Sequence, residues 1–135
     1  MPLGKAILLY GLTVPVFFAV DMLWLGLVAK GFYARHLGHL LSPKVKWGPA
    51  LLFYFLYIAG ILVFAVLPAV EKDSWGKAVL LGGLFGLFTY ATYDLTNLAT
   101  MRDWPVIVAF LDILWGIVLS GTVSAASFWI AGKIL

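Results

Sequence analysis

Long apolar runs separated by short polar stretches dominate the chain. Four runs, at about residues 6–29, 49–70, 78–100 and 105–131, are long enough to cross a membrane. A hydrocarbon core about 30 Å thick needs roughly 20 mostly apolar residues in a helix. Short connections then force neighbouring spans to run antiparallel. The pattern predicts a single all-α integral membrane domain, a bundle of four transmembrane helices.

The first connection carries a pattern of its own. Apolar residues recur at helical spacing from Phe32 to Leu41, and polar side chains fall mostly on the opposite side. This is typical of a short amphipathic helix lying in the membrane interface. We therefore expect such a helix over residues 32–41, ended by Pro43.

Composition agrees with a membrane location and removes several other classes of protein. The 135 residues are 64% hydrophobic and 11% charged, with a mean hydropathy of +1.06. Soluble domains are roughly 45–50% apolar and about 25% charged. A soluble domain, a disordered chain and a nucleic-acid-binding domain are excluded. The absence of cysteine excludes a disulfide scaffold.

No metal or cofactor is expected from the sequence. The spans contain no cysteine and no histidine, and the glycine fingerprints of phosphate and dinucleotide sites are missing. The expected partners are membrane lipid and a small-molecule or lipid ligand, with no nucleic acid.

Basic residues leave the membrane orientation almost balanced. One side of the membrane receives Lys30, Arg35, Lys44, Lys46 and Arg102. The other side receives Lys5, Lys72, Lys77 and Lys133. A margin of one residue does not decide the orientation. The dense first connection favours placing that connection in the cytoplasm.

The two halves of the chain show a weak similarity. Asp21-x-x-Trp24-Leu25-Gly26 in the first span parallels Asp94-x-x-Asn97-Leu98-Ala99 in the third. One interpretation is a pair of tandem helical hairpins related by an axis along the membrane normal. Chance similarity between apolar sequences is the alternative.

Acidic residues inside the spans are the main functional signal. An aspartate in mid-bilayer costs roughly 2.5–3.5 kcal/mol, so such residues normally face the bundle interior. Asp21 and Asp94 lie late in the first and third spans, and Asp112 lies early in the fourth. In antiparallel helices these depths match. We expect the acids to converge in the half of the bundle nearest the first and third connections.

Other polar and aromatic residues fall at the same depth. Tyr90, Tyr93 and Asn97 surround Asp94 and are able to donate hydrogen bonds to it. The predicted site is an acidic and aromatic pocket under a basic rim formed by the first group of basic residues above. Its remaining candidate lining residues are Tyr54, Tyr57, Trp24 and Trp115. The two tryptophans either stack on a ligand or fill the bundle.

Small residues predict how the last two spans pack. Gly82 and Gly86 share one face of the third span, and Gly116, Ser120 and Ser124 share one face of the fourth. Such faces let membrane helices approach closely.

A family resemblance covers essentially the whole chain. It is carried by Asp21-x-x-Trp24, Tyr93-Asp94-Leu95-Thr96-Asn97-Leu98-Ala99-Thr100, Trp104-Pro105 and Asp112-x-x-Trp115-Gly116. These motifs resemble a bacterial family of small membrane proteins known as domain of unknown function 2177. The resemblance implies a multi-pass protein of the bacterial inner membrane, and it implies no activity.

Three functions are compatible with these residues. The first is binding or transport of a small molecule or lipid, with proton linkage as one form and a homodimer as the transporting unit. The second is modification of a lipid by Asp or Tyr acid–base chemistry. The third is a structural or accessory role in which the polar residues only lock helices together.

Overall fold

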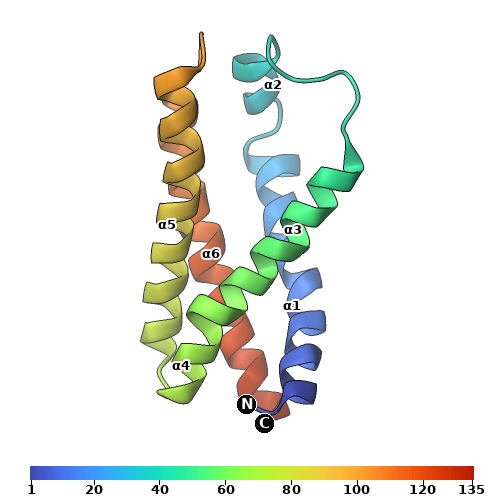
Figure 1. The fold of residues 1–135 in the computed structure, drawn as a ribbon, viewed down its shortest axis with the longest axis vertical. Coiled ribbons are helices and arrows are strands. Elements are labelled where there is room, and N and C mark those ends of the chain that lie inside the picture. Colours follow the sequence, from blue (N-terminus) through green and yellow to red (C-terminus); the bar gives the residue numbers. More distant parts are fainter.

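The computed structural model describes residues 1–135 and is 83% helical, without strands. Four long apolar helices confirm the predicted membrane spans. In chain order the elements are α1 (Leu3–Leu23), η1 (Trp24–Val28), α2 (Phe32–Leu37), α3 (Trp47–Ile61), η2 (Leu62–Val66), α4 (Leu67–Glu71), α5 (Trp75–Thr100) and α6 (Val106–Ile134). The first span is α1 with η1, and the second is α3, η2 and α4 (Figure 1).

The spans end within three residues of the predicted boundaries, and most of the difference is added length. Helix α5 begins three residues before its predicted start, where a polar residue caps it. The Ser74 hydroxyl accepts a hydrogen bond of 3.1 Å from the backbone N–H of Lys77 at the start of α5.

The helix in the first connection is shorter than predicted and ends at Leu37 instead of residue 41. Gly38 follows it, and glycine loses more conformational freedom in a helix than any other residue. Leu40 and Leu41 are exposed, whereas Leu37 is buried against Trp104 and Val108. The helix α2 is therefore attached to the end of the bundle through Leu37.

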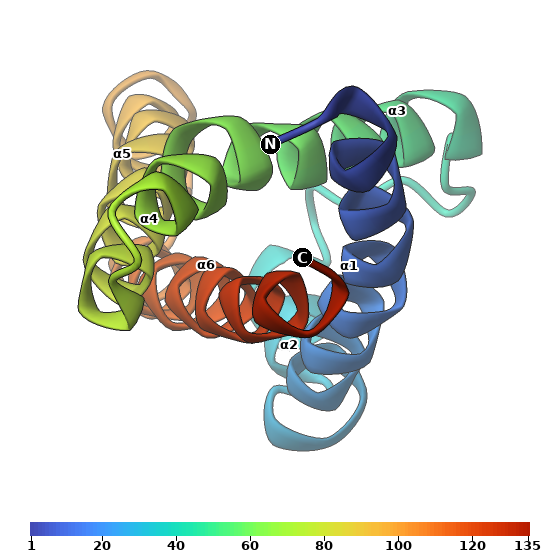
Figure 2. The same cartoon turned by 90° about the horizontal axis from the view of Figure 1, so that it is seen from below.

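Helix α6 lies between α5 and α1 and packs along both (Figure 2). Its closest partner is α5. A Cβ atom at Gly86 would overlap the Gly116 carbonyl, and one at Gly82 would lie 2.5 Å from Ser124 Cβ. The backbones can approach this closely only because those positions carry no side chain. The predicted small-residue seam is thus the tightest contact of the fold.

Hydroxyl groups on the buried faces of α6 find partners on neighbouring helices. Ser124 donates to the Ala78 carbonyl of α5 at 2.8 Å, and Ser127 lies 2.8 Å from the Thr13 hydroxyl of α1. Buried hydroxyls without partners would destabilise the bundle. These bonds join α6 to both of its neighbours.

The second span leans across the bundle instead of running beside α5 along its whole length (Figure 1). Its later elements, η2 and α4, pack on α5, and α3 diverges from α5 toward its N-terminal end. The α1–α3 hairpin is therefore packed more loosely than the α5–α6 hairpin. Tandem duplication stays a prediction.

Both chain ends lie at the same end of the bundle, opposite α2 (Figure 1). The Lys5 ammonium donates to the Ile134 carbonyl at 2.7 Å and so joins the first helix to the last.

Replacing Gly86 by alanine should lower the stability of the bundle. The new methyl group would force α5 away from α6, and such overpacking costs about 1–3 kcal/mol. Gly83→Ala is the matched control in the same helix, because its Cβ would meet only Ile117 at 3.7 Å, an ordinary contact. Thermal unfolding in detergent should show a lower Tm for Gly86→Ala than for Gly83→Ala. Equal Tm values would contradict the packing of the seam.

Candidate functional site

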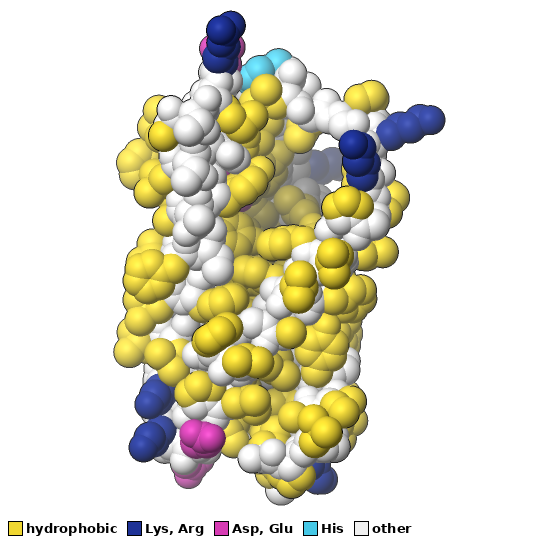
Figure 3. All heavy atoms as spheres, viewed as in Figure 1, with side chains coloured by type: hydrophobic (Ala, Val, Ile, Leu, Met, Phe, Trp, Pro, Cys, Tyr) yellow, Lys and Arg dark blue, Asp and Glu magenta, His cyan; other side chains and the backbone are white.

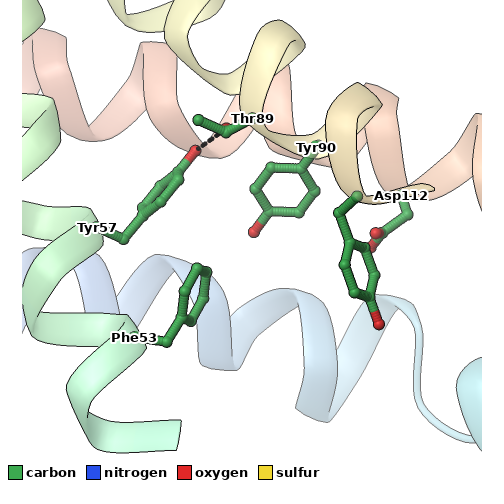
Figure 4. A pocket seen from close by; sticks show the side chains of 6 residues that line it. Phe53, Tyr57, Thr89, Tyr90 and Asp112 are labelled. Atoms are coloured by element: carbon green, nitrogen blue, oxygen red, sulfur yellow. Dashed lines mark hydrogen bonds between the residues drawn. The ribbon is translucent and has the colours of Figure 1, made fainter. Parts of the chain in front are cut away.

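A cavity of about 350 Å³ lies between α3 and α5 in the half of the bundle nearest α2. It is lined by Phe53, Tyr57, Thr89, Tyr90, Tyr93 and Asp112. Figure 4 shows Phe53 and Tyr57 of α3 facing Thr89 and Tyr90 of α5, with Asp112 at one end. Its walls are mainly aromatic, with a carboxyl group on one side.

A second cavity of about 190 Å³ adjoins the first, because Phe53, Tyr90 and Asp112 line both. Its other lining residues are Asp21, Trp24, Leu25, Tyr33, Tyr54 and Trp115. The two cavities together are called the acidic pocket below. Figure 3 shows a hollow between α5 and α3 at this level of the molecule. The pocket is thus approached from the side of the bundle.

Asp112 is held by a residue from outside the spans. The Tyr33 hydroxyl of α2 donates to Asp112 Oδ1 at 2.8 Å, and the Trp24 indole N–H donates to that hydroxyl at 3.0 Å. Burial and the neighbouring Asp112 carboxylate raise the pKa of the Tyr33 phenol above its ordinary value. Tyr33 therefore remains a protonated donor at neutral pH.

Asp21 is held by the fourth span. The Trp115 indole N–H donates to Asp21 Oδ1 at 3.2 Å. The Trp115 ring also stacks on the Trp24 ring, with centroids 4.8 Å apart and planes within 8°. The two tryptophan rings thus stack face to face. Their N–H groups bond to Asp21 and to the Tyr33 hydroxyl that bonds Asp112, so the stacked pair connects the two acids.

Asp94 differs from the other two acids. It is fully buried, and neither of its carboxyl oxygens receives a hydrogen bond from a donor group. The expectation that Tyr93 would donate to it is wrong: Tyr93 is 56% exposed and packs edge-on against Trp104, with centroids 5.8 Å apart. Asn97 is half-buried and lies beside the Tyr93 hydroxyl. The Asp112 carboxyl is the polar group that interacts with Asp94.

The inner end of the pocket is closed by hydroxyl groups. Tyr57 lies 2.6 Å from the Ser120 hydroxyl and 3.1 Å from that of Thr89. The Tyr90 ring covers Gly116, where any side chain would overlap it. Tyr54 packs between the helices against Phe17, with centroids 5.9 Å apart.

The structure brings most of the predicted site residues together. The acids, Trp24, Trp115, Tyr54, Tyr57 and Tyr90 lie in or directly behind the acidic pocket. Lys30, Arg35, Lys44, Lys46 and Arg102 are all exposed, in the connections at the end of the molecule that carries α2. The carboxyl groups are thus hydrogen-bonded only by neutral donors, a tyrosine and a tryptophan.

Sequence reasoning missed Tyr33, Phe53, Thr89 and Ser120 as parts of the site. Tyr33 lies within the predicted interfacial helix at residues 32–41, and its hydroxyl group is the feature that indicates a polar partner. Thr89 and Ser120 lie at the depth of Tyr57 in antiparallel spans, which could have identified them.

A family model described as predicted membrane protein (DUF2177) matches residues 6–129. No curated protein and no solved structure matches the chain.

Tyr33→Phe should destabilise the protein by about 1–3 kcal/mol, because it leaves the Trp24 N–H and an Asp112 oxygen without their partner. Tyr93→Phe is the matched control, since its ring is half-exposed and its hydroxyl bonds neither carboxyl group. Thermal unfolding in detergent measures both variants. If the two substitutions have the same effect, Tyr33 does not join α2 to the pocket.

Proposed function

The chain belongs to the DUF2177 family of predicted membrane proteins, and from the geometry of its pocket we propose that it binds a small molecule or a lipid within the membrane. The ligand occupies the acidic pocket between α3 and α5. The resemblance to a bacterial family supports a location in the bacterial inner membrane.

The unpartnered carboxyl of Asp94 is the observation that carries this proposal. Residues that only lock helices together should have their polar atoms satisfied, because an unsatisfied buried group costs about 1–3 kcal/mol. Asp94 is fully buried without a donor, directly behind the Asp112 carboxyl that lines the cavity. Uncompensated polar groups beside a cavity are typical of a site built for a ligand.

Binding is better supported than transport. The pocket opens at the side of the bundle between α3 and α5, and its inner end is closed by the hydrogen bonds of Tyr57 and by buried residues such as Ile61 and Leu119. Passage across the membrane would require a second arrangement of the helices. A homodimer is proposed only for that case, since four helices enclose little volume.

Lipid modification stays a prediction from the sequence. Tyr33 and Asp112, joined by a hydrogen bond of 2.8 Å, are the pair that would carry acid–base chemistry. Neither residue is adjacent to a serine or cysteine nucleophile in the lining of the pocket.

The protein purified in a mild detergent should retain a ligand, which extraction and mass spectrometry would identify. We expect Asp112→Asn to lose most of that ligand, because the substitution removes the carboxylate that lines both cavities. Asp73→Asn is the control, an exposed acid at the opposite end of the molecule that tolerates the same change. Equal retention by the wild type and both variants would contradict binding in the acidic pocket.

A further inference from the structure

We propose that the acidic pocket receives an ammonium group, the cationic end of an amphiphile whose apolar tail remains in the bilayer between α3 and α5. This inference rests on the proposed binding function and adds the chemical class of the ligand and its route of entry.

The charge of the pocket favours a cation. Asp21 and Asp112 line it, and each has one oxygen bonded by a neutral donor and a second oxygen outside those bonds. The basic residues at this end of the molecule are exposed in the connections. A positively charged ligand would therefore supply the positive charge that the pocket itself lacks. Its attraction to the carboxyl groups would be strong, because little water is present to screen it.

The aromatic rings favour an ammonium group over a metal ion. Tyr57 and Tyr90 meet at 80° with centroids 6.0 Å apart, and Phe53 is tilted by 39° to Tyr57 at 5.5 Å. Rings that are mutually inclined present their negative faces to a shared space, as in sites that recognise quaternary ammonium groups. A small metal ion would need several oxygen ligands instead.

The size of the cavity favours the head of a larger molecule. Ligand sites span roughly 300–1,000 Å³, and the larger cavity measures about 350 Å³. It accommodates a compact headgroup and leaves no room for a long acyl chain. The tail must lie elsewhere.

The side opening provides that place. Helix α3 diverges from α5 toward its N-terminal end, and the second span packs on α5 mainly through its later elements η2 and α4, with Tyr57 of α3 also reaching Thr89 of α5 (Figure 1). Phe53 and Tyr93 stand at the two sides of the opening, 49% and 56% exposed, although both line the cavity. An amphiphile can enter here with its head inward and its tail among the lipids.

The test is a titration of tryptophan fluorescence, to which Trp24 and Trp115, two of the six tryptophans of the chain, contribute from inside the pocket. The protein in dodecyl maltoside is titrated with dodecyltrimethylammonium, with tetramethylammonium and with the zwitterion dodecylphosphocholine. We expect dodecyltrimethylammonium to bind, and Asp112→Asn to weaken its binding about tenfold or more, because a buried charge loses its partner. Asp73→Asn should bind as the wild type does.

Two controls separate a loss of binding from a loss of folding. Asp112→Glu keeps the charge and should retain more affinity than Asp112→Asn, and thermal unfolding identifies any variant that has lost its structure. Binding that is equal in Asp112→Asn and Asp73→Asn would overturn the ammonium site. Tetramethylammonium binding as tightly as the long-chain cation would overturn entry from the bilayer and identify a free amine as the ligand.

Failure of this inference is distinguishable from failure of the proposed function. A retained ligand without a cationic group, together with no response to the ammonium probes, would remove the ammonium assignment and leave the binding function intact. The proposed binding function itself would be contradicted if the Asp112→Asn variant and the wild type retained the same compounds in equal amounts.

Discussion

Carboxyl groups inside a hydrocarbon layer are the constraint on which this structure depends. Each costs roughly 2.5–3.5 kcal/mol at mid-bilayer, so a bundle that contains several must bring them out of lipid. Here Asp21, Asp94 and Asp112 come from different helices and face one region. The donors to Asp21 and Asp112 are neutral, and the donor to Asp112, Tyr33, is supplied by a short helix outside the spans. The site therefore depends on α2 being attached to the bundle, which the burial of Leu37 against Trp104 achieves.

The two helical hairpins make different contributions to the pocket. The α5–α6 hairpin, close-packed along glycine and serine, fixes Asp94 and Asp112 relative to each other. The second span is inclined and contains a wide helical turn at Leu62–Val66, a feature that often occurs near functional sites in helices. Its inclination leaves α3 apart from α5 and opens the side of the bundle. A close-packed hairpin that carries Asp94 and Asp112 thus faces a more loosely packed helix that carries Phe53 and Tyr57, and Tyr90 and Tyr93 of α5 complete the aromatic lining.

The sequence predicted the features that depend on the length of the spans and on the depth of residues in the membrane. It did not predict the positions that depend on contacts between helices. The spans follow from the bilayer thickness, and the meeting of the acids follows from equal depths in antiparallel helices. Tyr33 could not be placed in this way, because the position of α2 depends on the contact of Leu37 with Trp104. The error at Asp94 has a simple cause: Tyr93 is its neighbour in sequence, and consecutive residues of a helix point about 100° apart. The wide turns and the inclination of the second span have no clear signature in an apolar sequence.

The stacked indoles of Trp24 and Trp115 have an optical consequence. Their planes are almost parallel at 4.8 Å, and each N–H is bonded within the carboxyl network. Two chromophores this close share their electronic excitation, so they absorb and rotate polarised light as a pair and not as two independent rings. The circular dichroism of the native protein therefore contains a signal that exists only while η1 and α6 are correctly packed beside the acids. This signal reports whether the contact between the two helices is intact, and it requires no added label.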